Sequence, residues 1–230
     1  TIEEARCDWW DYLETYVYDQ WNVELQEFLM DISIVEQFDL SMARMITKKM
    51  DAGRLINLAQ ENGNILFVHT ARDREIYELR TPVKKSMRRM LRNRCSMQHI
   101  DVLYYNAACS YELQGKIVEA LVMYEKCHNE EGISRLLIEN ARKYPGIGYY
   151  WELRRYYLGL SEHTVRQSPE LMAGMSLLQS ILLNDEESEK WYQALLEYEK
   201  SQSGSMKKEA KARLFYLDIA LPQRGTRHMT

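Results

Sequence analysis

YYNAACSYELQGKIVEALVMYEKC, residues 104–127, is the stretch that decides the predicted fold. Four of its residues recur at i, i+3, i+4 and i+7 and share one face of a first helix: Tyr104, Ala107, Ala108 and Tyr111. Gln114 and Gly115 break this pattern and predict a turn. Three later residues mark the inner face of a second helix: Ala120, Tyr124 and Cys127. The stretch therefore predicts two helices that fold back on each other.

The offsets of these residues are those of a tetratricopeptide repeat. Small side chains at Ala108 and Ala120 let the two helix backbones approach closely. The closing proline of the repeat is missing, because Gly132 stands there. Ala194, in WYQALLEYEK, occupies a place equivalent to that of Ala120 in VEALVMYEK, and it predicts a further hairpin. An ordinary helical hairpin is the alternative, since a single repeat discriminates weakly.

Composition indicates a folded protein that is long enough for two domains. The chain has 230 residues, of which 46% are hydrophobic and 28% charged. A net charge of −4 argues against a surface that binds nucleic acid or anionic membranes as a whole. No apolar run reaches about 18 residues, so we expect no membrane span. Four widely separated cysteines, Cys7, Cys95, Cys109 and Cys127, are typical of a reducing cytoplasm.

The first 94 residues predict a winged-helix domain. Apolar periodicity indicates helices at 8–19 and 23–34, a short helix capped by Asp39 or Ser41, and a helix from Asp51 to Asn62. The period then changes to that of strands at 65–68 and 76–79, joined by a charged turn at 71–75. A closing helix follows Pro82. A few small helices followed by a two-stranded wing make up the winged-helix outline.

Residues 95–230 predict only helices. They fall at 130–143, 149–158, 169–183, 186–200 and 206–220, separated by turns such as the one at Pro145 and Gly146. Helix pairs of this kind bury their faces by stacking, so we expect a tetratricopeptide-like, right-handed α-solenoid. The fold class is thus mainly α, and the predicted domain boundary lies in the polar stretch 92–98, giving domains at 1–94 and 95–230.

Basic residues gather on the closing helix. Lys84, Lys85, Arg88 and Arg89 form a candidate patch for phosphate groups or an acidic partner, because several fixed cations are needed to hold a polyanion. The alternative is a solvated face that pairs with acidic neighbours. In the predicted hairpin, a candidate groove for an effector or peptide is lined by Tyr105, Asn106, Cys109 and Glu112. Plain helix packing is the alternative there.

Catalytic motifs are absent from the sequence. No glycine stands in a G-x-x-x-x-G-K-[ST] frame, and no G-x-S-x-G, H-E-x-x-H or C-x-x-C occurs. Cys95 and His99 have the i, i+4 spacing of a metal half-site, but no second pair lies within reach in the sequence. We therefore predict no metal site, no cofactor bound by this chain and no enzymatic activity.

A winged helix followed by tetratricopeptide-like helices resembles the central part of the MalT-like, LuxR-family ATP-dependent transcriptional regulators, a group of signal-transduction ATPases with numerous domains. Short segments in the family's order carry the resemblance: WDYL at 10–13, FLMDISI at 28–34, LINLAQENGNILF at 55–67 and QSPEL at 167–171. Family members usually have a His after the second wing strand, near the nucleotide phosphates. Arg80 stands at about that place here, and an Arg can hold a phosphate with two hydrogen bonds.

The resemblance implies a regulatory fragment of a longer cytoplasmic protein, and a first residue that is Thr agrees with that expectation. An ATPase domain that binds ATP or ADP would precede this chain, and a DNA-binding helix-turn-helix would follow it. The solenoid would receive a small-molecule or protein effector. The alternative is a stand-alone tetratricopeptide-type adaptor for protein interactions. Direct DNA readout by the winged helix, through the basic closing helix, is a third hypothesis.

Overall fold

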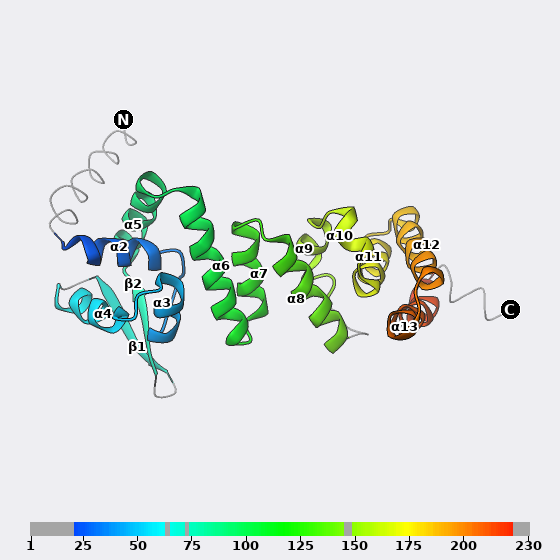
Figure 1. The fold of residues 1–230 in the computed structure, drawn as a ribbon, viewed down its shortest axis with the longest axis horizontal. Coiled ribbons are helices and arrows are strands. Elements are labelled where there is room, and N and C mark those ends of the chain that lie inside the picture. The colour runs from blue at the N-terminus through cyan, green and yellow to red at the C-terminus, as the bar shows by residue number, and fades with distance from the viewer. Residues whose placement is uncertain (1–20, 63–64, 72–73, 145–148, 223–230) are drawn as a thin grey trace. The chain divides into compact units, whose positions relative to one another are not determined.

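A computed structural model describes residues 21–62, 65–71, 74–144 and 149–222. The described chain is mainly helical and contains one two-stranded sheet (Figure 1). It divides into two compact units, residues 1–129 and residues 130–230. The helix predicted at 8–19, the WDYL segment and the turn at Pro145 and Gly146 lie outside the described residues.

From residue 21 onward, the described part of the first unit begins with α2 (Val23–Ile32), α3 (Leu40–Thr47) and α4 (Ala52–Glu61). Their starts are set locally. Asp39 Oδ1 accepts the Met42 N–H at 2.7 Å, which confirms Asp39 as the cap of the short helix. Their apolar faces meet in a core that water does not reach: Leu25, Phe28, Leu29, Ile32, Met42, Ile46, Leu55 and Ile56.

The wing consists of β1 (Leu66–Ala71) and β2 (Arg74–Leu79), which pair in antiparallel fashion. Both strands extend further toward the turn than the sequence pattern predicts. On its other side, β2 is met by Phe38, whose N–H donates to the Tyr77 carbonyl at 3.0 Å and whose carbonyl accepts the Tyr77 N–H at 2.8 Å. This one-residue strand between α2 and α3 completes the winged-helix order of helix, strand, two helices and a hairpin.

A closing helix, α5 (Thr81–Arg94), leads into a helical hairpin made of α6 (Met97–Leu113) and α7 (Ile117–Lys126) (Figure 1). The predicted hairpin is confirmed, although α6 begins seven residues earlier than the quoted stretch. Gly115 adopts φ 71° in the turn, a left-handed conformation that favours glycine. Ala107, Ala108 and Ala120 are completely buried, which permits the close approach of the two helices.

The second unit is entirely helical over its described residues. It comprises α8 (Glu130–Lys143), α9 (Arg154–Leu158), α10 (Glu162–Arg166), α11 (Pro169–Ile181), α12 (Asp185–Ser201) and α13 (Gly204–Ala220). α11 is buried along nearly its whole length, and α12 and α13 pack against it. The helix predicted at 149–158 is reduced to α9 after an irregular 149–153, and α10 was not predicted from the sequence.

The position of the domain boundary depends on α6. Asn106 on α6 donates from Nδ2 to the Ile46 carbonyl of α3 at 3.2 Å, so the hairpin packs on the helices of the winged helix. The compact units accordingly divide after Asn129. The domain boundary at residues 92–98 stays a prediction. No helix in the described part of the chain is long and apolar enough to cross a membrane.

Candidate functional sites

Of the four cations in the predicted patch, Lys84 and Arg88 bond α5 to the connection between α2 and α3. Lys84 is buried, its Nζ contacts the Glu36 carboxylate, and it lies 3.7 Å from Glu78 Oε1. Arg88 donates from Nε to the Ser33 carbonyl at 2.6 Å and from Nη2 to Glu36 Oε1 at 2.9 Å. These bonds, that from Lys84 foremost, hold the pKa of Glu36 below its usual value.

Within the described residues, the other two cations of the predicted patch are not bonded to Glu36. Lys85 is exposed and Arg89 is half-buried, and they share a shallow pocket of about 380 Å³ with further residues of α5. The side chains that line this pocket are basic or amide: Lys85, Arg88, Arg89, Arg92 and Asn93. Lys126 of α7 lies near this face, since Arg88 and Arg92 add to burial in lowering the pKa of its ammonium group. The structure therefore gives α5 one structural pair of cations and one outward basic face.

Arg80 caps the N-terminus of α5 at the base of the wing. Its backbone N–H donates to the Ile65 carbonyl at 2.9 Å, and its guanidinium lies 4.1 Å from the centre of the Phe67 ring. The Nε atom is buried and has no hydrogen-bond partner among the described residues. Arg80 is thus held by stacking, with a polar atom left without a partner, and its phosphate contact stays a prediction.

The predicted groove residues of α6 separate into two directions. Tyr105, Cys109 and Glu112 lie beside Tyr124 of α7: the Tyr105 and Tyr124 rings meet edge to face at 5.9 Å, and Cys109 Sγ lies 3.6 Å from the Tyr124 hydroxyl. Burial first, and then bonds to Glu112 and Cys109, raise the pKa of Tyr124. Asn106 is buried and turned toward α3. One helical step of about 100° separates Asn106 from Tyr105, which accounts for the different directions.

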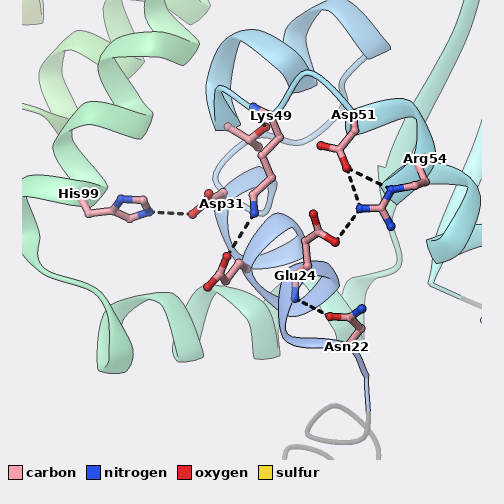
Figure 2. A network of polar contacts seen from close by, with 9 residues as sticks. Asn22, Glu24, Asp31, Lys49, Asp51, Arg54 and His99 are labelled. Atoms are coloured by element: carbon pink, nitrogen blue, oxygen red, sulfur yellow. Dashed lines mark hydrogen bonds and ion pairs between the residues drawn. The ribbon is translucent and has the colours of Figure 1, made fainter.

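A contact that sequence reasoning missed joins α2 to α6 (Figure 2). His99 Nε2 lies 2.8 Å from Asp31 Oδ1, and Asp31 is 7% exposed. The partners are 68 residues apart in the chain, so no local pattern signals the pair. Burial raises the pKa of Asp31, and the contact with His99 partly offsets that rise. Close to this contact, Lys49 Nζ lies 3.2 Å from Glu27 Oε2.

Cys95 and His99, considered as a metal half-site, line a pocket of about 360 Å³ together with Asp31 and Glu27. Over the ranges that the structure describes, no group of three or more His, Cys, Asp or Glu side chains is arranged to hold a metal ion. Burial and the nearby carboxylates raise the pKa of the Cys95 thiol, which disfavours the thiolate form. The described residues of this pocket join α2 to α6 through the contact of Asp31 with His99, and the absence of a metal site stays a prediction.

Comparison with known proteins bears on the first unit. Residues 13–99 match the family model of the MalT winged helix domain. Within the described residues, the match spans α2 to α5 together with the wing and the start of α6. Neither the curated proteins nor the solved structures give a match to the chain. The similarity and the observed topology agree on a winged helix in this part of the sequence.

Proposed function

We propose that this chain is a regulatory segment of a cytoplasmic, LuxR-family, MalT-like transcriptional regulator. The match of residues 13–99 to the MalT winged helix domain is the observation that carries the proposal. The helices that follow it would form a right-handed, tetratricopeptide-like sensor that binds a small molecule or a protein. An ATPase switch and a DNA-binding domain would lie outside this chain, so that ATP, ADP and DNA are bound elsewhere and this segment performs no catalysis.

The charges of α4 favour docking on protein over reading DNA. α4 precedes the wing, the place of the helix that enters the major groove in helix-turn-helix proteins. Its sequence, AGRLINLAQE, has a single cation, Arg54, and Arg54 is bonded to Glu24 at 2.6 Å and to Asp51 at 2.7 Å (Figure 2). Two basic residues of α5 are likewise held by Glu36. On α4, the single cation is therefore already paired, whereas binding to DNA depends strongly on contacts between cations and phosphates. The outward basic face of α5, with Lys85, Arg89 and Arg92, lies outside α4.

Within the proposed regulator, Arg80 would contact nucleotide phosphate from the base of the wing. Its Nε has no partner among the described residues, and its place follows the second wing strand. The winged helix would then sense whether nucleotide is bound. The hairpin surface of Tyr105, Cys109 and Glu112 would receive the effector, because a Tyr side chain that is 45% exposed offers both apolar contact and a hydroxyl.

The reading frame on both sides of this segment tests the proposal. We expect a nucleotide-binding motif upstream and a helix-turn-helix downstream, and we expect the 230-residue chain to lack ATPase activity and specific duplex binding. In the long protein, Arg80→Ala should speed the release of ADP, whereas Lys207→Ala in the second unit should not. Absence of both flanking domains would favour a stand-alone adaptor. Tight sequence-specific binding of the chain to a duplex would overturn the proposed role.

A further inference from the structure

A hollow of about 810 Å³ lies between α3 and β2, on the winged helix. This volume is within the range of sites that take ligands or side chains of a partner, roughly 300–1,000 Å³. Its lining combines apolar and basic side chains: Leu40, Met45, Tyr77, Arg44, Lys48 and Arg74. The basic residues come from two elements, α3 with the residue that caps its C-terminus and β2, so the fold brings them together.

The edge of β2 is open at this hollow. Tyr77 uses its N–H and its carbonyl to bond Phe38, on the side of β2 that faces away from β1. Because backbone groups alternate between the two sides of a strand, the N–H and carbonyl of Glu75 point the same way as those of Tyr77. No backbone partner for Glu75 occurs on that side among the described residues. The hollow therefore borders an unpaired edge position of β2 at Glu75, next to the pair that Tyr77 forms with Phe38, and an unpaired strand edge can accept another strand.

The charges around the edge are also unbalanced. Arg44, Lys48 and Arg74 are exposed, and none of them forms an ion pair within the described part of the chain. The two acidic residues of the lining are engaged locally. Asp39 accepts the Met42 N–H, and Glu75 accepts the Tyr77 hydroxyl. Three uncommitted cations thus surround the edge of β2 at Glu75, where one backbone donor and one backbone acceptor have no backbone partner among the described residues.

We propose that this hollow binds an extended, carboxylate-rich peptide segment of a partner. The segment pairs its backbone with β2 at Glu75, and its carboxylates contact Arg44, Lys48 and Arg74. Backbone pairing supplies affinity in such strand addition, and side chains supply selectivity. Leu40, Met45 and Tyr77 provide apolar contact for alternate residues of the segment. The inference stands on the winged helix alone and does not depend on the assignment as a regulator.

A fluorescein-labelled octapeptide of alternating Glu and Val tests the site, with fluorescence anisotropy as the measurement and the full 230-residue chain as receptor. We expect saturable binding that weakens as salt is added, because exposed charges are screened. The variant Arg44→Gln/Lys48→Gln/Arg74→Gln should bind at least about tenfold more weakly, a loss of about 1.4 kcal/mol. The matched variant Lys207→Gln/Lys208→Gln/Lys211→Gln makes the same charge change on exposed residues of α13 and should bind as the unmodified chain does.

Two further probes separate strand pairing from charge attraction. A peptide of alternating Lys and Val should not bind, and the Glu and Val peptide N-methylated at every residue should lose most of its affinity because it cannot donate backbone hydrogen bonds. Hydrogen exchange of the Glu75 amide should slow when the unmodified peptide is bound. Equal binding of the N-methylated peptide, an unchanged Glu75 amide, or an equal loss in the α13 variant would each overturn the proposal.

Discussion

At the scale of single residues, Glu170 on α11 shows how a buried carboxylate is kept charged. It is 1% exposed, accepts the Ser168 hydroxyl at 2.6 Å, and lies 2.7 Å from Arg142 Nε. Burial opposes ionisation, but the bonds from Ser168 and Arg142 outweigh it, so the pKa of Glu170 lies below its usual value. A lowered pKa stabilises the fold above the pKa of the unfolded chain, and that contribution is lost as the pH falls through the folded value.

Arg142→Ala should therefore destabilise the chain by about 2 kcal/mol at pH 7, because a buried carboxylate loses a charged partner. The loss of stability caused by Arg142→Ala should decrease toward pH 4, because Glu170 of the variant becomes protonated there and a neutral carboxyl group needs no cationic partner. Denaturant unfolding followed by circular dichroism at both pH values measures the effect. Arg135→Ala is the control, since Arg135 and Glu139 are both exposed and such pairs contribute under about 1 kcal/mol. An equal cost of Arg142→Ala at the two pH values would contradict the assignment.

Two helical glycines make a second residue-scale comparison. A Cβ at Gly174 of α11 would lie 2.7 Å from Cε1 of Tyr157, whereas one at Gly53 of α4 would meet Leu40 at an ordinary 3.6 Å. Gly174→Ala should destabilise the chain by about 1–3 kcal/mol through overpacking. Gly53→Ala should instead stabilise it by up to about 1 kcal/mol, because alanine favours the helix. Thermal unfolding of both variants measures the difference in sign, and stabilisation by Gly174→Ala would refute the close approach.

At the scale of elements, the contact between Asp31 and His99 couples α2 to α6. The pKa of Asp31 is raised, mainly by burial, with Glu27, Lys49 and Cys95 as further neighbours. A raised folded pKa means that the contribution to stability is present below the unfolded pKa and is lost as the pH rises through the folded value. The unmodified chain should thus lose stability relative to Asp31→Asn as the pH rises above about 4, the ordinary pKa of an Asp side chain, and denaturant unfolding at a series of pH values measures this loss.

Asp51→Asn serves as the control for this pH dependence. Asp51 is exposed at its Arg54 contact, and the bond from Arg54 lowers the pKa of Asp51. The stability of the unmodified chain relative to Asp51→Asn should therefore stay constant with pH, or rise as the pH rises. A profile for Asp31→Asn that matches the control would show that burial does not govern Asp31, and the joint between α2 and α6 would then be a simple surface contact.

Elements with local signals were predictable. Asp39 marks the start of α3, Pro82 marks the start of α5, and the bounds 130–143 of α8 were predicted to the residue. The segment 149–158 was not, because its conformation depends on packing: Tyr150 and Tyr157 lie against Gly174 of α11. A helical period cannot report a close approach to a glycine in another element. The tyrosine-rich sequence therefore appeared more helical than it is.

At the scale of the whole molecule, the sequence predicted the order of the elements apart from α10, and it missed the contacts that join them. The winged-helix outline follows from periodicity, yet the bond of Phe38 to Tyr77, the Lys84 contact with Glu36 and the pairing of His99 with Asp31 all connect distant parts of the chain. The candidate sites show the same limit. Pairing of Lys84 and Arg88 with acidic neighbours was one alternative from the sequence, but only the fold identifies Glu36 as the partner.

The placement of α6 against the winged helix allows the predicted domain boundary to be tested. A fragment of residues 1–94 lacks α6, which covers α3 through the bond of Asn106 to Ile46 and meets α2 through His99. A fragment of residues 1–129 keeps both contacts and the buried side chains Ile100 and Leu103. Burial of each such side chain contributes about 1.5–3 kcal/mol, so the longer fragment should be more stable by more than about 3 kcal/mol in urea unfolding. Equal stability of the two fragments would place the boundary at residues 92–98, because α6 would then add nothing to the winged helix.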